Sequence, residues 1–411
     1  MIPTEQALIL LILLIGLIVV LALLAKAGLE RIGLPALVGY IVLGLLLHVA
    51  DQRLQLFSAG EREVLEFLAN IGIISLLFRV GLESKLNELV HQLRRASVIL
   101  LGDILVSGLL GFFTAYGLLK LSLIPSLFVG TAMTATSVGI TVSLWREAQA
   151  INSPNGELML DVAEMDDISA VIMMALLLAV APVLQSNPDA TAIAPLLAQT
   201  AGTFCLKAIV FGASCFLFSR YVERSLTQFF QRIEAPPDPT IMVTGIGLIT
   251  AAFAGLLGFS VAIGAFFAGL VFSRDPDAIK LDASFDTFYE TFVPFFFVGI
   301  GLKVDLSAIS AALGLGVILL IVAVLGKMVG VAVPTLMMSG GASAILLGVS
   351  MVPRAEITMI VMQHGLQLGD WAVPPQVFSA MVLVSAATTI MVPLVLRPLL
   401  QRWPQTSERY L

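Results

Sequence analysis

Two adjacent aspartates, Asp166 and Asp167, lie in the middle of an otherwise mainly apolar segment that runs from Pro154 to Pro182. A helix of this length spans roughly 43 Å, which exceeds the ~30 Å hydrocarbon core of a bilayer. Carboxylates at such a depth are costly to bury, so they indicate a path for ions or protons. Neighbouring residues of a helix point about 100° apart, so the two carboxylates cannot face the same group.

Lys327 offers a partner for one of these aspartates. It lies within a second apolar segment, in the sequence LGKMVG, where an unpaired ammonium would be costly. We therefore expect one aspartate to pair with Lys327. The other should face two interrupted helices and alternate between binding a proton and binding a cation.

Two segments carry residues that interrupt a helix. Residues 124–144 hold hydroxyl and glycine positions at their centre, including Thr136 and Ser137. Residues 341–364 contain Pro353, which removes a backbone hydrogen bond and is followed by Arg354 and Glu356. Opened helices of this kind expose carbonyls and hydroxyls that coordinate small cations. The simpler alternatives are close packing through small residues in the first segment and an ion pair that only holds the break in the second.

Further acidic residues fall toward the expected cytoplasmic half of the membrane. They suggest an electronegative funnel that concentrates cations, although hydrogen bonding between helices would also account for them. The proposed funnel consists of Asp103, Asp161, Glu164 and Glu290. The sequence has no Walker or Rossmann signature, and its histidines lack ligand spacing, so we expect no cofactor and no enzymatic activity.

The composition of the chain indicates that membrane-spanning helices position these charged and polar residues. Of the 411 residues, 58% are hydrophobic and 12% are charged, and the mean hydropathy of +1.01 indicates an all-α polytopic membrane protein. Thirteen transmembrane helices are predicted within one transmembrane domain, without a cytosolic regulatory domain. They cover residues 6–26, 34–50, 64–83, 97–119, 124–144, 155–182, 195–218, 239–257, 259–273, 284–302, 307–333, 341–364 and 374–396.

The sequence also predicts an internal repeat. Gly39 and Gly44 correspond to Gly264 and Gly269, and Gly81 corresponds to Gly301. The repeats cover residues 6–182 and 239–396, with residues 195–218 as a linker helix. Because an odd number of spans separates corresponding helices, the repeats run in opposite senses, as in secondary transporters. The excess of Lys and Arg in alternate loops places the N-terminus outside a cell membrane and the C-terminus in the cytoplasm.

Four motifs occur in order: TATSVGIT, AEMDDISAV, LGKMVG and MVPRAEITMIV. Together they resemble the bacterial monovalent cation:proton antiporters of the Kef/NapA type, and most closely the NapA-like Na+/H+ antiporters. The resemblance implies a NhaA/NapA-like fold with two crossing discontinuous helices, and a homodimer in the bacterial inner membrane. It makes Asp167 the carboxylate that binds Na+ or the proton, and Asp166 the partner of Lys327.

The same resemblance places Thr136 and Ser137 where the broken helices cross, with Arg354 and Glu356 on the opposite helix. The acidic Glu164 departs from the apolar residue usual in relatives. We therefore expect electrogenic Na+ or Li+ exchange for protons across a lipid bilayer, without nucleic acid. The alternatives are K+/H+ exchange, a cation channel that uses the same carboxylates, and a symporter of organic anions.

Overall fold

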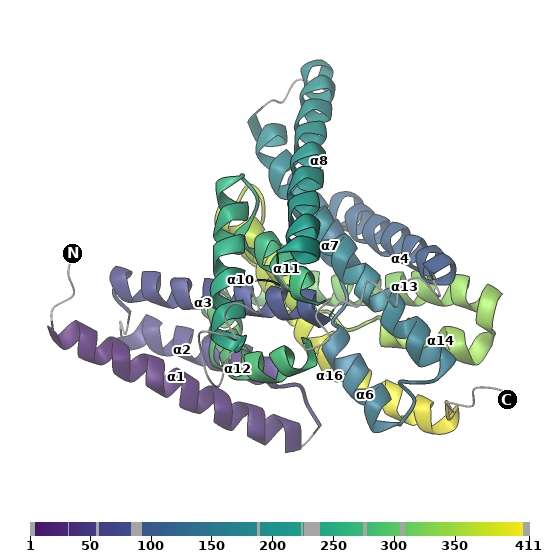
Figure 1. Ribbon diagram of the computed structural model, residues 1–411, viewed down its shortest axis with the longest axis horizontal. Coiled ribbons are helices and arrows are strands. Elements are labelled where there is room, and N and C mark those ends of the chain that lie inside the picture. Colours follow the sequence, from purple (N-terminus) through teal and green to yellow (C-terminus); the bar gives the residue numbers. More distant parts are fainter. Residues whose placement is uncertain are drawn as a thin grey trace. The chain divides into compact units, whose positions relative to one another are not determined.

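The computed structural model describes residues 5–31, 33–54, 57–83, 93–186, 190–222, 225, 239–273, 278–304 and 309–405. Every regular element within these ranges is helical (Figure 1). By length and composition, nine stretches of the described chain can cross a bilayer: Leu11–Arg31, Ala36–Leu54, Ala59–Leu82, Arg95–Leu118, Leu123–Glu147, Pro154–Ser186, Ala198–Tyr221, Ala311–Ser339 and Pro375–Arg402. Large apolar side chains such as Leu13, 66% exposed, lie on their outer faces, as lipid contact requires. The prediction of an all-α polytopic membrane protein is confirmed.

Each of the thirteen predicted segments coincides with one helix or with a pair of half-helices. In the N-terminal part these are α1 (Glu5–Arg31), α2 (Ala36–Leu54), α3 (Ala59–Glu83), α4 (Leu93–Phe113) with the π-helical turn η1 (Thr114–Leu118), α5 (Leu123–Thr134), α6 (Val138–Glu147), α7 (Pro154–Ser186) and α8 (Ala190–Tyr221). In the C-terminal part they are α10 (Pro239–Leu256), α11 (Val261–Phe272), α12 (Ala278–Leu302), α13 (Ile309–Ser339), α14 (Gly341–Ser350), α15 (Glu356–Leu368) and α16 (Pro375–Arg402).

The end of α7 differs from the prediction. The helix was expected to end at Pro182, but it continues to Ser186 with Pro182 inside it. Proline is tolerated within transmembrane helices because neighbouring helices and local adjustments satisfy the freed backbone groups.

The helices form two compact units. The first unit comprises Met1–Ala27, Gly39–Asn87 and Asp189–Leu302, and the second comprises Gly28–Val38, Glu88–Pro188 and Lys303–Leu411. The residues predicted to form the broken helices, with Asp166, Asp167 and Lys327, all belong to the second unit.

Glycines set the helix spacing in the first unit. A Cβ atom added at Gly44 would lie 2.1 Å from a carbonyl oxygen of α12, and one at Gly301 would lie 2.2 Å from a carbonyl oxygen of α2. The same holds between α3 and α11, where the distances are 2.2 Å for Gly81 and 2.0 Å for Gly269. Only glycine allows backbones to approach this closely. Four of the six glycines that suggested the repeat therefore lie at these helix contacts.

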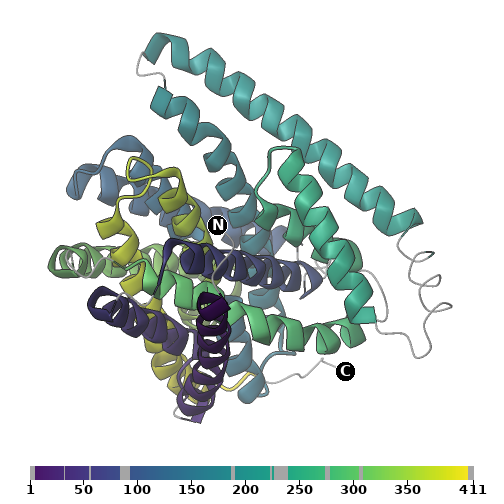
Figure 2. The same cartoon turned by 90° about the vertical axis from the view of Figure 1, so that its left-hand side faces the viewer.

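Aromatic side chains join α8 to α11 in the same unit, and Figure 2 shows these two helices next to each other. The Phe211 and Phe267 rings lie edge to face with centroids 5.5 Å apart, and Phe204 meets Phe259, which lies in the turn before α11, at 5.4 Å in the same geometry. Edge-to-face pairs of this kind add about 0.5–1.5 kcal/mol beyond the burial of their area.

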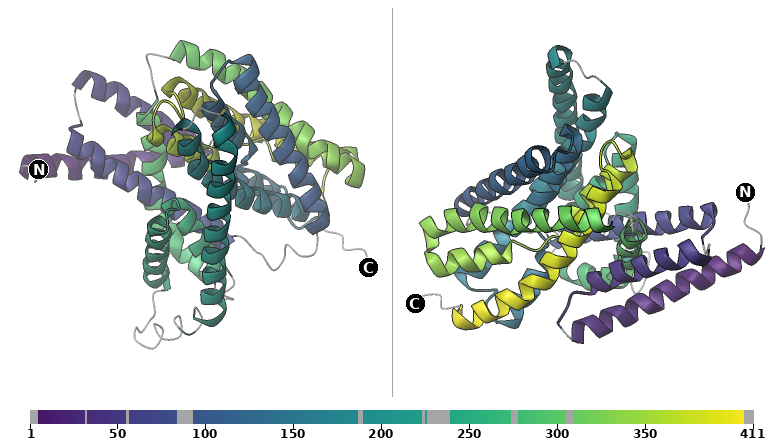
Figure 3. Two further views of the ribbon diagram at one scale, coloured as in Figure 1. Left: turned by 90° about the horizontal axis from the view of Figure 1, so that it is seen from above. Right: turned by 180° about the vertical axis from the view of Figure 1, so that it is seen from behind.

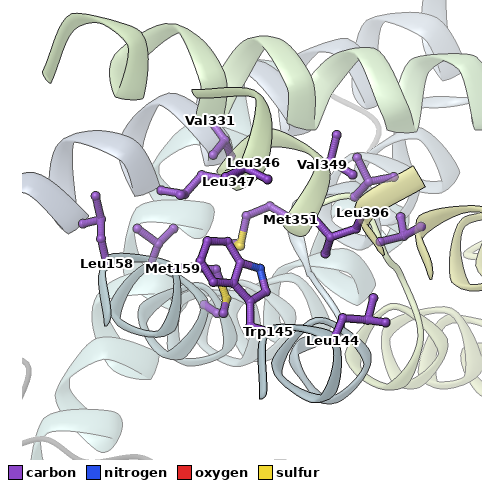
Figure 4. Packing of buried hydrophobic residues seen from close by; sticks show 14 of the residues in the cluster. Leu144, Trp145, Leu158, Met159, Val331, Leu346, Leu347, Val349, Met351 and Leu396 are labelled. Carbon is purple, nitrogen blue, oxygen red and sulfur yellow. The ribbon is translucent and has the colours of Figure 1, made fainter. Parts of the chain in front are cut away.

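In the second unit, α4 lies along α13 (Figure 1), and α13, α14 and α16 pack together, as Figure 3 shows from behind. The fully buried Trp145 of α6 lies in a hydrophobic cluster between Met351 and Met159 (Figure 4). Its indole Nε1 donates a hydrogen bond of 2.9 Å to the hydroxyl of Ser350. This contact joins the second half of one interrupted helix to the first half of the other.

Candidate functional site

Both central aspartates of α7 are buried. Asp166 has no exposed surface and Asp167 is 7% exposed, so each carboxylate must be stabilised within the protein or by a bound ion. The backbone of Asp166 is further engaged, because its carbonyl accepts a hydrogen bond from Ser169.

Lys327 of α13 makes three contacts at its ammonium group. It donates to Asp103 Oδ2 at 2.5 Å, to Asp166 Oδ2 at 3.3 Å and to the carbonyl oxygen of Thr134. An ammonium group carries three hydrogens, so all three have an acceptor. Lys327, Asp103 and Asp166 are all fully buried. The pairing of Lys327 with one of the two aspartates is therefore present in the structure, and that aspartate is Asp166.

The two predicted breaks are present and lie against each other. One separates α5 from α6 at residues 135–137, and the other separates α14 from α15 at residues 351–355. The backbone nitrogen of Ser137 donates to the carbonyl oxygen of Pro353 at 2.7 Å. Thr136 Oγ1 donates to the carbonyl oxygen of Met351 at 3.3 Å, and Thr141 Oγ1 donates to that of Ser350 at 2.7 Å. One backbone N–H and two threonine hydroxyls at or after the first break thus satisfy carbonyl oxygens at or just before the second.

Arg354 lies fully buried at the second break. Its guanidinium donates to the carbonyl oxygen of Met133 at 2.6 Å and to that of Val352 at 3.1 Å. Met133 and Thr134 end helix α5, so two cations, Arg354 and Lys327, meet the negative end of this helix dipole. An ion pair between Arg354 and Glu356 was one expectation; the guanidinium of Arg354 donates to two carbonyls, and Glu356 is half-buried.

Two oxygen atoms near this crossing are left for a ligand. Ser137 Oγ and Asp166 Oδ1 are buried and have no hydrogen-bond partner among the described residues. A buried polar atom without a partner costs about 1–3 kcal/mol. Oxygen atoms are the ligands that hard cations prefer, so this arrangement can hold a small cation or a water molecule.

The four residues of the predicted funnel occupy different environments. Asp103 is fully buried and binds Lys327, which does not fit a funnel position open to water. Glu290 belongs to the first unit, where its carboxylate binds Lys26 at 2.5 Å. Asp161 and Glu164 are half-buried on α7, and for them an entrance role stays a prediction.

Sequence reasoning missed the contact between Asp103 and Lys327. These residues are 224 positions apart, and no local motif connects them. The signal that was available is the pair of glycines flanking the lysine, Gly326 and Gly330, which indicates a closely packed helix on that face of α13.

Comparison with known proteins agrees with this fold. Residues 16–402 match the family described as sodium/hydrogen exchanger, transmembrane. The chain is 29% identical to the Na+/H+ antiporter of Enterococcus hirae over 370 residues, which cover 90% of this chain and 92% of that protein. It is 28% identical over 369 residues to the Na+/H+-K+ antiporter GerN of Bacillus cereus, with 89% and 90% covered.

The fold is also that of a solved structure. The sodium proton antiporter MjNhaP1 from Methanocaldococcus jannaschii superposes with a TM-score of 0.72 at 17% identity, over 96% of this chain and 97% of that one. The family match covers most of the chain, and the resemblance found in the sequence motifs is confirmed. The chain therefore belongs to the sodium/hydrogen exchanger family and is a transporter rather than an enzyme.

Proposed function

We propose that this protein exchanges Na+ or Li+ for protons, and that proton and cation compete for Asp167. The observation that carries the proposal is the buried cluster at the crossing of the two broken helices. There, Asp166 and Lys327 meet the end of α5, and Asp167 is the next residue of α7. A carboxylate at such a site binds either a proton or a cation, which couples the two fluxes.

The ligands around the crossing favour a cation over an organic anion. Asp166 Oδ1 and Ser137 Oγ are oxygen atoms with capacity for a ligand. Lys327 already binds two carboxylates and a carbonyl, and Arg354 donates to two carbonyls. Of the nitrogen atoms of these two cations, only the Nε of Arg354 is buried without a hydrogen-bond partner among the described residues, and one N–H group does not make an open anion site. This chemistry supports cation exchange over the symport of organic anions.

Alternating access follows from the proposed inverted repeats, residues 6–182 and 239–396, joined by the linker within 195–218. The glycine contacts support this arrangement. The repeat relates Gly44 to Gly269 and Gly301 to Gly81, so it relates the contact between α2 and α12 to the contact between α11 and α3. A channel that uses the same carboxylates would not require two related halves.

Orientation, assembly and charge movement are further parts of the proposal. The distribution of Lys and Arg supports an outside N-terminus and a cytoplasmic C-terminus. The sequence motifs support a homodimer and electrogenic exchange by resemblance. A steady current carried by the purified protein during exchange would support electrogenicity, and its absence would contradict it.

K+/H+ exchange is the second candidate. It is favoured by the name of one relative, the Na+/H+-K+ antiporter GerN, which is 28% identical to this chain. The residues of the site do not distinguish Na+ from K+ by charge alone, so the ion must be identified by measurement.

The test uses the purified protein in liposomes with an imposed pH gradient and a pH-sensitive dye in the lumen. Na+, Li+ and K+ are added in turn to the wild type, to Asp167→Asn and to the control Glu157→Gln, an exposed carboxylate on the same helix. We expect Na+ and Li+ to dissipate the gradient with the wild type and the control but not with Asp167→Asn. If Asp167→Asn exchanges normally, the assignment of Asp167 is wrong, and if no cation acts on the wild type, the antiport proposal is wrong.

A further inference from the structure

Lys327 binds two carboxylates, and Asp103 lies closer to its ammonium group than Asp166 does. Asp103 Oδ2 lies 2.5 Å from the Lys327 ammonium, whereas Asp166 Oδ2 lies at 3.3 Å. All three side chains are fully buried, where an uncompensated charge is costly. From these distances, Asp103 contributes more than Asp166 to neutralising the positive charge of Lys327.

The two carboxylates also differ in their remaining oxygens. Asp103 Oδ1 accepts a hydrogen bond of 2.9 Å from Ser107, one turn along α4. Asp166 Oδ1 is buried without a hydrogen-bond partner among the described residues. Both oxygens of Asp103 are thus satisfied by the protein itself, whereas Asp166 keeps one oxygen available for a ligand.

Two glycines of α13 allow the backbone of α4, which carries Asp103, to lie close to Lys327. A Cβ atom added at Gly330 would lie 2.9 Å from the Cα of Asp103, and one added at Gly326 would lie 3.0 Å from the Cα of Ser107. The glycines on either side of Lys327 therefore let α4 approach at the level of the lysine. Any larger residue would move Asp103 away from the ammonium group.

Other charged groups near Lys327 do not replace Asp103. Asp166 comes from α7, and Arg354, from the break between α14 and α15, contacts the end of α5 and has the same charge as Lys327. Helix α14, which packs against α13, contains no charged residue, and the arginines of α16 are near its C-terminal end. Asp103 is the carboxylate that α4 contributes.

We propose that Asp103 is the main counter-ion of Lys327, a positioning residue that holds the ammonium by the shorter contact, so that the lysine engages only one oxygen of Asp166. Asp103 and Lys327 then stay a neutral pair through the transport cycle. Asp166 remains available beside Asp167 as a second carboxylate for protons and cations. This inference rests on the proposed antiport function and adds a residue that the sequence motifs did not contain.

Asp103→Asn is the informative variant. With the carboxylate of Asp103 removed, the ammonium must rely on Asp166, where it competes with the transported cation. A charge at this range changes the affinity of a carboxylate for a cation or proton by roughly tenfold or more. We therefore expect the KM for Na+ to rise roughly tenfold and the pH profile of exchange to be displaced, while Asp103→Glu stays close to wild type.

The experiment measures exchange in liposomes for wild type, Asp103→Asn, Asp103→Glu and the control Glu157→Gln, an exposed carboxylate of α7. If Asp103→Asn has the KM and pH profile of the wild type, the inference is overturned. If the wild type itself shows no cation-dependent proton flux, the proposed function fails instead, and a thermal measurement still decides the inference.

That measurement is a double-mutant cycle of the unfolding temperature in detergent. Lys327→Gln is introduced into the wild type, into Asp103→Asn and into Asp166→Asn. We expect Lys327→Gln to lower the unfolding temperature much less in Asp103→Asn than in the wild type, and the coupling to Asp166 to be smaller. A coupling that is larger for Asp166 than for Asp103 would overturn the inference.

Discussion

Replacing Gly269 by alanine tests the close helix contacts of the first unit. The added Cβ would lie 2.0 Å from the carbonyl oxygen of Phe78, whereas unbonded carbon and oxygen atoms approach to roughly 3.3 Å. Helices α3 and α11 must therefore separate by about 1.3 Å. Overpacking of this kind costs about 1–3 kcal/mol, and the separation also removes dispersion contacts along the interface.

Thermal unfolding of the purified protein in detergent measures this cost. The control is Gly245→Ala on α10, where nothing lies within 4 Å of an added Cβ. Alanine is favoured over glycine inside a helix by roughly 0.5–1 kcal/mol, so the control should be as stable as the wild type or slightly more stable. We expect Gly269→Ala to unfold several degrees lower, and Gly44→Ala to behave alike if the repeat holds. Equal unfolding temperatures for Gly269→Ala and Gly245→Ala would refute the packing argument.

Two further predictions concern the crossing of the broken helices. Ser137→Ala removes a buried hydroxyl whose oxygen has no hydrogen-bond partner among the described residues, so the free energy of unfolding should not fall. The KM for Na+ should rise several-fold, and an unchanged KM in the liposome assay would exclude this hydroxyl as a ligand. Trp145→Phe keeps most of the apolar volume but loses the 2.9 Å bond to Ser350, which should cost about 1–3 kcal/mol. Ser350→Ala in the Trp145→Phe background should restore part of that loss in thermal unfolding, and an additive further loss would contradict the role of the bond.

Local sequence signals predicted the helices and their interruptions. Continuous apolar segments define a membrane helix because the bilayer requires both length and internally satisfied backbone groups. The hydroxyl run around Thr136 and the proline at position 353 each weaken a helix locally, and the structure has breaks at both places. The contact between Asp166 and Lys327 was predictable because two buried opposite charges need each other.

The remaining features depend on packing between distant segments. Asp103 and Lys327 are 224 residues apart, and burial alone does not say which of several carboxylates a lysine will meet. Asp103 was therefore assigned to a funnel, although the glycines at positions 326 and 330 bring its helix to the lysine. The hydrogen bond from Arg354 to the carbonyl of Met133 could not be predicted either, because a sequence does not show which helix end lies next to a charged side chain.

The measurement that tests competition at one site most directly is the dependence of Na+-driven proton exchange on pH in liposomes. If proton and cation compete for Asp167, the KM for Na+ rises in proportion to the proton concentration at acid pH, while the maximal rate at saturating Na+ stays constant. A maximal rate that falls with acid while the KM stays unchanged would mean that the proton and Na+ bind at separate sites, and would contradict the proposed mechanism.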